Sequence, residues 1–191
     1  MLTLSCTRKV STSRYSLEKT NKVLAFPVID EVKMPQFSVF LFNENGEDYL
    51  SYQNLPKNEI LIYSIDSQCL IKRLCINTEG DNSVVGGFGG YYIADMQHIF
   101  IPSMYVNTIF VVDTVGKVRR KITYEKTRDN QELKPFMLSD RSQMVFIGNN
   151  LYIPQTINLR LGDKAIAESP IKVVIDTAEN IIKALPMSCL L

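Results

Sequence analysis

The stretch Thr108-Ile109-Phe110-Val111-Val112-Asp113-Thr114, followed by Gly116-Lys117-Val118-Arg119-Arg120-Lys121, decides the fold. β-Branched and aromatic residues dominate its apolar part, and they are typical of β-strands. An aspartate followed by a hydroxyl residue lies between the two halves, and this pair favours a tight turn. The stretch therefore predicts two antiparallel strands joined by a short turn.

The same pattern occurs twice more, at Ile60–Ser67 with Cys69–Arg73 and at Ile171–Thr177 with Asn180–Lys183. A second predicted hairpin precedes each copy, and Asn-Gly or Asn-Asn supplies the positive φ that tight hairpins need. These upstream strands are predicted at 36–42 and 48–53, at 89–94 and 98–103, and at 143–148 and 151–155. Four consecutive antiparallel strands with short turns form one blade of a β-propeller.

The spacing of the three copies supports this interpretation. The turn residues Asp66 and Asp113 are 47 residues apart, which matches the ~40–50 residues of a propeller blade. Asp113 and Asp176 are 63 residues apart, and the surplus predicts an inserted loop in the polar stretch Thr156–Ser169. As repeated turn residues, the three aspartates are expected to cap their turns rather than to bind a metal.

The predicted fold is all-β: a partial β-propeller of about three four-stranded antiparallel blades, with an additional N-terminal strand near Val23–Ile29. The blades are expected at roughly 36–76, 89–124 and 143–185, within a propeller fragment that spans 15–191. Residues 1–14 are expected to be a remnant of a signal and lipidation sequence followed by a tether. Cys69 and Cys75 are expected to be packed strand thiols.

Composition and charge exclude several classes of function. Lys and Arg number 21 against 20 Asp and Glu, so no bulk charge attracts nucleic acid. The sequence contains no run of 18 or more apolar residues, so no transmembrane helix is predicted. His98 is the single histidine, which argues against a zinc site or a Ser-His-Asp site, and it is expected to be packed or solvated. No catalytic residue and no cofactor is predicted, and the candidate ligand loops are Asn77–Val85, Glu125–Lys134 and Thr156–Ser169.

Several short motifs resemble one known family. They are Phe26-Pro27-Val28-Ile29-Asp30, Asn45-Gly46, Tyr49-Leu50, Asn54, Asp66, Glu79-Gly80, Asp113 and Gly116-Lys117. With these residues, over about 15–185, the chain resembles the Bacteroides-type lipoproteins of unknown function whose body is a six-bladed β-propeller. The resemblance implies a location in the cell envelope and no particular activity. Six blades need on the order of 280 residues, so the chain looks like the N-terminal half of such a protein.

The segment Met1–Cys6 looks like the end of a lipoprotein signal, because the small residue Ser5 precedes the cysteine. Neither a basic region nor an apolar core of 7–15 residues comes before it. Lipidation of Cys6 is therefore predicted in a longer parent protein. The alternative is a cytosolic start with an ordinary exposed cysteine. The polar run Thr7–Arg14 would suit a tether in either case.

These observations favour a binding or interaction module of the cell envelope, whose partner is an envelope protein or a glycan. Two alternatives stay open: a propeller hydrolase or lyase whose catalytic residues lie in missing blades, and a truncated gene product without function. Three blades cannot close a ring, so each terminal blade should expose an apolar face. We expect self-association through these open edges, aggregation, or an open half-ring with a mobile N-terminus. A compact small sandwich is the alternative.

Overall fold

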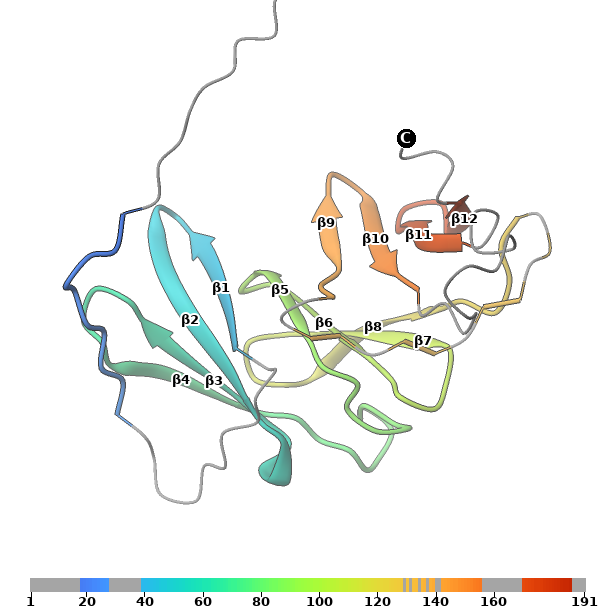
Figure 1. The fold of residues 1–191 in the computed structure, drawn as a ribbon. Coiled ribbons are helices and arrows are strands. Elements are labelled where there is room, and N and C mark those ends of the chain that lie inside the picture. Colours follow the sequence, from blue (N-terminus) through green and yellow to red (C-terminus); the bar gives the residue numbers. More distant parts are fainter. Residues whose placement is uncertain are drawn as a thin grey trace, which may run out of the picture.

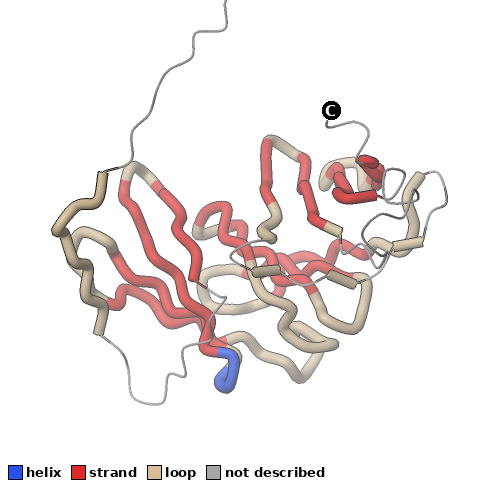
Figure 2. Tube along the Cα trace, viewed as in Figure 1, coloured by secondary structure: helices blue, strands red, loops and turns tan. Residues whose placement is uncertain are grey.

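The structure is a computed structural model that describes residues 18–27, 39–128, 130, 132, 133, 135, 136, 138, 139, 142–155 and 170–186. Cys6, the segment 1–14 and the predicted loop Thr156–Ser169 lie outside these described residues. Within them, the chain forms twelve strands and one short 3-10 helix, η1 (Leu55–Lys57), and no α-helix. Figure 2 shows the strands in red and their tan connections. The predicted all-β class is confirmed.

The twelve strands form three sheets of four, each built from consecutive antiparallel strands. Blade 1 contains β1 (Val39–Glu44), β2 (Glu47–Asn54), β3 (Glu59–Ser64) and β4 (Leu70–Cys75). Blade 2 contains β5 (Tyr92–Asp95), β6 (His98–Pro102), β7 (Thr108–Val112) and β8 (Val118–Thr123). Blade 3 contains β9 (Val145–Ile147), β10 (Asn150–Pro154), β11 (Pro170–Asp176) and β12 (Ile181–Pro186). The fold is the predicted partial β-propeller of three blades.

The turns follow from local sequence chemistry. Asn45 (φ 54°) and Gly46 (φ 84°) connect β1 to β2, and the Asn-Gly pair tolerates these positive φ angles. Asp113 Oδ1 accepts hydrogen bonds from the N–H groups of Val115 (3.0 Å) and Lys117 (2.9 Å) in the β7–β8 turn. These carboxylate bonds replace strand pairing where the chain reverses.

The predicted capping role is also confirmed for Asp176, whose Oδ1 accepts from the N–H groups of Ala178 (2.9 Å) and Glu179 (3.1 Å). It is wrong for Asp66. In the β3–β4 turn the acceptor is Ser64 Oγ, which receives the N–H of Ser67 at 3.2 Å. Ser64 ends β3 as Asp176 ends β11, so the first copy of the pattern is offset relative to the third.

The three blades stand next to one another with β1, β5 and β9 as neighbouring inner strands (Figure 1). One apolar core lies between blades 1 and 2, and it contains buried residues such as Ile62, Ile99 and Val112. A second core lies between blades 2 and 3 and contains Phe100 and Ile153 among others. Burial between blades is therefore what holds this open arrangement together.

The connectors between blades also contribute to these cores. Phe88 and Tyr91, which lie between β4 and β5, are buried in the first core. Tyr124, Leu133 and Phe136, which lie between β8 and β9, are buried in the second core. Each connector thus fills space between the two sheets that it joins. The core is continuous with the loops rather than confined to the strands.

The predicted N-terminal strand near Val23–Ile29 is wrong in its described part, because residues 18–27 form no strand. They lie against the face of blade 1 that points away from blade 2. Phe26 packs edge-on against Tyr63 with ring centroids 5.6 Å apart. Tyr63 Oη donates to Pro27 O at 3.2 Å, and Ala25 N donates to Gln68 Oε1 at 2.8 Å. Side chains of blade 1 make most of these contacts. The segment 18–27 therefore forms no ladder of backbone hydrogen bonds with blade 1.

The predicted packing of Cys69 and Cys75 is also wrong, since both thiols are exposed. Cys69 precedes β4, and Cys75 is its last residue. β4 is the outermost strand of its blade and pairs on one side only, with β3. Cys75 Sγ donates to Glu59 Oε1 at 3.8 Å.

Candidate functional site

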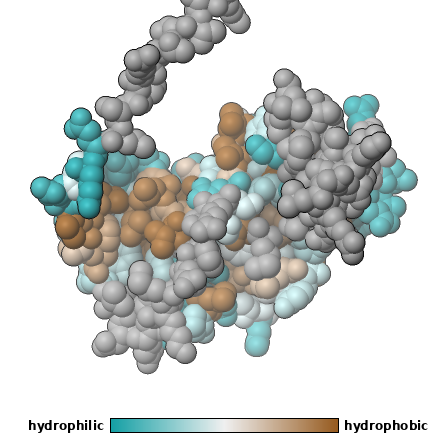
Figure 3. All heavy atoms as spheres, viewed as in Figure 1, coloured by the Kyte–Doolittle hydropathy of each residue, from teal (hydrophilic) through white to brown (hydrophobic). Residues whose placement is uncertain are grey.

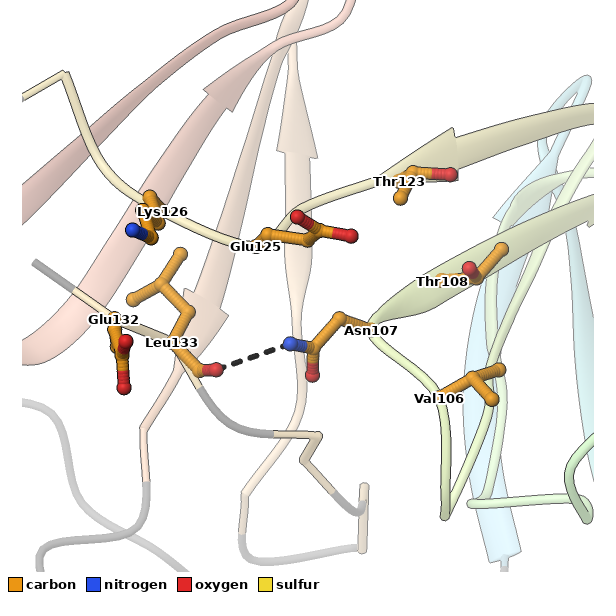
Figure 4. Close-up of a pocket in the computed structure, with 8 residues that line it drawn as sticks. All are labelled: Val106, Asn107, Thr108, Thr123, Glu125, Lys126, Glu132 and Leu133. Atoms are coloured by element: carbon orange, nitrogen blue, oxygen red, sulfur yellow. Dashed lines mark hydrogen bonds between the residues drawn. The ribbon is translucent and has the colours of Figure 1, made fainter. Parts of the chain in front are cut away.

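A cleft of about 470 Å³ opens beside the start of β7 and the end of β8 (Figure 4). Its volume falls in the range of roughly 300–1,000 Å³ that is usual for small-molecule sites. The β6–β7 loop, the two strand ends and the connector that follows β8 supply its walls. The lining residues are Val106, Asn107, Thr108, Thr123, Glu125, Lys126, Glu132 and Leu133.

The connector forms one wall because it folds back on itself as a small hairpin. Leu133 N donates to Glu125 O at 2.9 Å, and Lys126 and Glu132 form an antiparallel bridge. Asn130 allows the reversal with a φ of 64°. Leu133 is buried in the core between blades 2 and 3 and anchors the returning arm. The side chains of Glu125, Lys126 and Glu132 are left exposed around the cleft.

Asn107 is the most informative residue of the cleft. Its Nδ2 donates to Leu133 O at 3.0 Å and so joins the β6–β7 loop to the connector, as the dashed line in Figure 4 shows. Its Oδ1 is buried and has no hydrogen-bond partner within the described part of the chain. A buried acceptor without a partner costs about 1–3 kcal/mol. A ligand that donates an N–H or O–H group to this oxygen would recover that free energy, provided that the Asn107 side chain rotates to expose the oxygen to the cleft.

A second cleft, of about 450 Å³, lies next to the first and shares Lys126 with it. It is lined by Lys126, Thr127, Arg128, Asn180, Ile181 and Ile182. Arg128 N donates to Ile182 O at 2.8 Å, which ties the connector to β12. Lys126 therefore stands between two hollows, one beside blade 2 and the other beside blade 3.

The core beneath the first cleft is rich in aromatic side chains. Tyr124, which is 1% exposed, directly follows β8 and packs on Phe136 with ring centroids 5.3 Å apart. Burial raises the pKa of the Tyr124 hydroxyl, which therefore stays protonated at neutral pH. Asn107 O accepts from Tyr124 N at 2.9 Å, so the loop and the strand end are joined through the backbone as well.

His98 lies on the β5–β6 hairpin and does not line the cleft. Its Nδ1 is 2.9 Å from both carboxylate oxygens of Asp95, and its ring stacks on Phe146 at 5.8 Å between centroids. Burial acts to raise the pKa of Asp95, but hydrogen bonds from His98 and from Gln97 N outweigh it and lower that pKa. The His98 side chain is 49% exposed, so the residue is partly solvated as well as packed against Phe146.

The sequence predicted one wall of the cleft, the connector after β8, but not the wall that the β6–β7 loop forms. The predicted ligand loop Glu125–Lys134 supplies four of the lining residues, whereas Asn77–Val85 supplies none. The loop with Asn107 was not singled out. In the sequence this loop is a five-residue stretch, Ser103-Met104-Tyr105-Val106-Asn107, with polar residues only at its two ends, between two apolar strands. Only the fold shows that its last residue meets the connector.

No group of three or more His, Cys, Asp or Glu side chains in the described ranges could hold a metal ion. None of the helical segments that the structure describes is long and apolar enough to cross a membrane.

Comparison with known proteins places these features in context. The family described as "Domain of unknown function (DUF4221)" matches residues 14–190. A crystal structure of a member of this family from Bacteroides vulgatus is similar in fold, with a TM-score of 0.72 and 21% sequence identity over 86% of this chain and 46% of that chain. A protein of unknown function from Bacteroides caccae has a TM-score of 0.43 and 14% identity, over 77% of this chain and 48% of that chain. No curated protein matches. The chain spans about half the length of these solved chains.

Proposed function

The chain belongs to the DUF4221 family, a family of unknown function, and we propose that it is a binding module of the bacterial cell envelope. Its ligand site is the cleft beside Asn107, and its ligand is a polyhydroxylated molecule such as a glycan. The observation that carries this proposal is the buried Asn107 Oδ1, which lacks a hydrogen-bond donor within the described residues. The hydroxyl group of a sugar can supply that donor.

The other lining groups suit the same ligand class. The Glu125 and Glu132 carboxylates accept hydrogen bonds, Lys126 donates them, and the hydroxyls of Thr108 and Thr123 do both. A ligand with many hydroxyl groups can satisfy such a mixed set without carrying charge of its own. The balanced net charge of the chain, +1, likewise gives no preference for a strongly charged partner.

Tyr105 adds a flat apolar surface next to the cleft. It is 73% exposed and lies in the β6–β7 loop, two residues before Asn107. Its ring lies close to Gly87, where an added Cβ would be 3.3 Å from it. An exposed aromatic ring beside the cleft can stack on the apolar face of a sugar ring.

The envelope location rests on the context of Cys6 and on the lipoprotein resemblance. We propose that Cys6 is lipidated in a longer parent protein and that Thr7–Arg14 is the tether to the propeller. Fractionation of cells that make this parent, followed by mass spectrometry of its N-terminal peptide, tests this part. Recovery of the protein in the cytosolic fraction with an unmodified cysteine would contradict it.

Screening of the whole chain on a glycan array, followed by calorimetry with the best ligand, tests the binding site. We expect the Asn107→Ala and Glu125→Gln variants to weaken binding at least about tenfold, which corresponds to ~1.4 kcal/mol. Asn149→Ala, in the exposed β9–β10 turn, is the matched control and should bind like the wild type. Absence of any glycan signal, or equal affinity in all four proteins, would refute the assignment of this site.

A further inference from the structure

The second cleft differs from the first in the charge of its walls. Lys126 and Arg128 are the charged residues among its six lining residues, so its charge is entirely positive. The first cleft contains the carboxylates of Glu125 and Glu132 together with Lys126. Figure 3 shows hydrophilic atoms at the right-hand edge of the molecule, where the connector between β8 and β9 lies, in contrast to the apolar surface over β1 and β2. The two clefts are therefore neighbouring hollows of unlike charge.

Both cations of the second cleft are exposed. Neither Lys126 nor Arg128 forms an ion pair with a carboxylate of the described residues. The cations of the preceding strand differ in this respect, because Arg119 binds the Asp113 carboxylate and Arg120 donates to a backbone oxygen of blade 3. Two cations that line a hollow without such a partner can bind an anionic group of a ligand.

The backbone of the connector holds these two cations in place. Arg128 N donates to Ile182 O at 2.8 Å and attaches the connector to β12. Thr127, between the two cations, is 5% exposed, and its O accepts from Asn130 N at 2.9 Å. Lys126 takes part in the antiparallel bridge of the connector hairpin. The backbone positions of both cations are therefore set by the fold.

The other walls of the second cleft suit a sugar unit better than a free inorganic anion. Ile181 and Ile182 of β12 supply apolar surface, and Asn180, in the β11–β12 turn, supplies an amide that can donate and accept hydrogen bonds. A sugar unit has apolar C–H groups as well as hydroxyl groups, so both kinds of wall find a partner. A free phosphate or sulfate ion would leave the apolar wall without a contact.

We propose that the second cleft is an anion subsite and that the ligand of this protein is an acidic oligosaccharide. This inference rests on the proposed function. A neutral sugar unit occupies the first cleft beside Asn107, and a neighbouring unit that bears a carboxylate or a sulfate group occupies the second. The Arg128 guanidinium binds this anionic group through parallel N–H bonds, and Lys126 adds a second positive charge.

The charges of the two clefts also set the orientation of the ligand. Glu125 and Glu132 repel an anionic group in the first cleft, since like charges brought together cost free energy. Lys126 and Arg128 attract the same group in the second cleft. An oligosaccharide with a single acidic unit should therefore bind in one orientation. Such a ligand is compatible with the small net charge of the chain, +1, because a local pair of cations is sufficient to bind one anionic group.

Calorimetry on the whole chain with matched pairs of oligosaccharides tests this proposal. One pair is oligogalacturonic acid and the same oligomer with its carboxyl groups reduced to hydroxymethyl groups. The other pair is a carrageenan oligosaccharide and its desulfated form, so the two pairs distinguish a carboxylate from a sulfate. We expect the acidic member of at least one pair to bind at least about tenfold more tightly than its neutral counterpart. This preference should shrink as the salt concentration rises.

Three variants locate the preference in the second cleft. Arg128→Gln should reduce it to within about twofold. Lys183→Gln is the matched control, because Lys183 is an exposed cation of β12 that lines neither cleft, and this variant should keep the wild-type preference. Asn107→Ala acts in the first cleft and should weaken the binding of both members of a pair by a similar factor. Thermal unfolding of each variant should confirm that it is folded.

The outcomes distinguish a failure of this inference from a failure of the proposed function. Neutral glycans that bind as tightly as their acidic counterparts would overturn the anion subsite and leave the glycan site standing. A preference for the acidic member that persists in Arg128→Gln would place the anionic group elsewhere and would also overturn the subsite. Absence of binding to any glycan, acidic or neutral, would overturn both proposals.

Discussion

Blades 2 and 3 are built from the same four-strand pattern but differ in how many of their faces are buried. In β6, the consecutive residues Ile99, Phe100 and Ile101 are 0%, 2% and 0% exposed. In β10, Leu151 and Ile153 are each 0% exposed, whereas Tyr152 between them is half-buried. Successive strand residues point to opposite faces. Among the described residues, blade 2 therefore lies between two neighbouring blades, and blade 3 has one.

This difference shows what a repeat does and does not specify. Turn chemistry and strand pairing form each blade from its own residues, so the blades resemble one another. Stability, in contrast, comes from apolar surface buried between blades, and it depends on position in the array. Substitutions at counterpart positions should therefore have unequal effects in blades 2 and 3.

The largest effect is expected for Val112→Asp. Val112 is 0% exposed in the core between blades 1 and 2, and a buried unpaired carboxylate costs several kcal/mol, which is comparable with the total stability of a domain. We expect an insoluble protein or the loss of cooperative thermal unfolding. Ile147→Asp, on the exposed face of blade 3, should retain cooperative unfolding. Soluble Val112→Asp that melts near the wild-type temperature would contradict this placement.

Alanine at the counterpart positions Phe100 and Tyr152 gives a graded comparison. Phe100 lies between blades 2 and 3, and its ring centroid is 5.2 Å from that of Phe146. Phe100→Ala should lower the free energy of unfolding by about 3–5 kcal/mol. Tyr152→Ala should lower it by less than about 1.5 kcal/mol, because Tyr152 lies on the face of blade 3 that points away from blade 2, and no described blade covers that face. Equal losses in urea titrations of monomeric protein would show that blade 3 is covered after all.

Alanine substitutions at two glycines with positive φ can distinguish the cost of backbone strain from the cost of a close contact between segments. Gly90 has a φ of +87°, and an added Cβ would lie 2.6 Å from Leu138 O, in the connector between blades 2 and 3. Gly148, in the β9–β10 turn, has a φ of +59°, and no atom of the described residues lies within 4 Å of an added Cβ. We expect a loss of ~2–4 kcal/mol for Gly90→Ala and ~1 kcal/mol for Gly148→Ala in urea unfolding. The reverse order would be inconsistent with the close approach at Gly90.

The smallest effect concerns the capping aspartate of blade 2. Burial acts to raise the pKa of Asp113, but hydrogen bonds from Lys117 N, Val115 N and Arg119 outweigh it and hold that pKa below its usual value of 3.8. The folded state therefore favours the carboxylate. This contribution to stability is present above pH ~4 and is lost as the pH falls through the lowered pKa.

The corresponding test compares wild type with Asp113→Asn across pH. The variant should be less stable by on the order of 1 kcal/mol near pH 7, and the difference should shrink below pH ~4. Arg119→Gln should raise the pKa of Asp113 toward its usual value, which NMR titration of the carboxylate can measure. A difference between wild type and Asp113→Asn that grows on acidification would have the wrong sign for this mechanism.

Much of the fold was predictable because its determinants are local. The β-branched runs, the Asn45-Gly46 turn and the capping residues Asp113 and Asp176 each act within a few residues of chain. The cap of the first blade was misassigned to Asp66, since a matching Asp-Ser pair does not show where β3 ends. Strand pairing ends two residues before Asp66, at Ser64.

The candidate site was predictable only in part, for a similar reason. A polar connector after β8 was visible in the sequence, and it does line the cleft. The partnership of Asn107 with Leu133, which lie 26 residues apart, depends on how the connector folds back. No periodicity or composition in the sequence encodes that approach.

By itself, the sequence determined an all-β chain of three repeated four-stranded units, because alternation of side chains and turn chemistry are properties of short segments. Only the tertiary structure decided which strand faces are buried, that residues 18–27 pack on blade 1 without forming a strand, and that Cys69 and Cys75 are exposed. The physical reason is that burial depends on what lies across the sheet. Neighbours across the sheet come from residues distant in the chain, and their approach is settled by packing rather than by local preference.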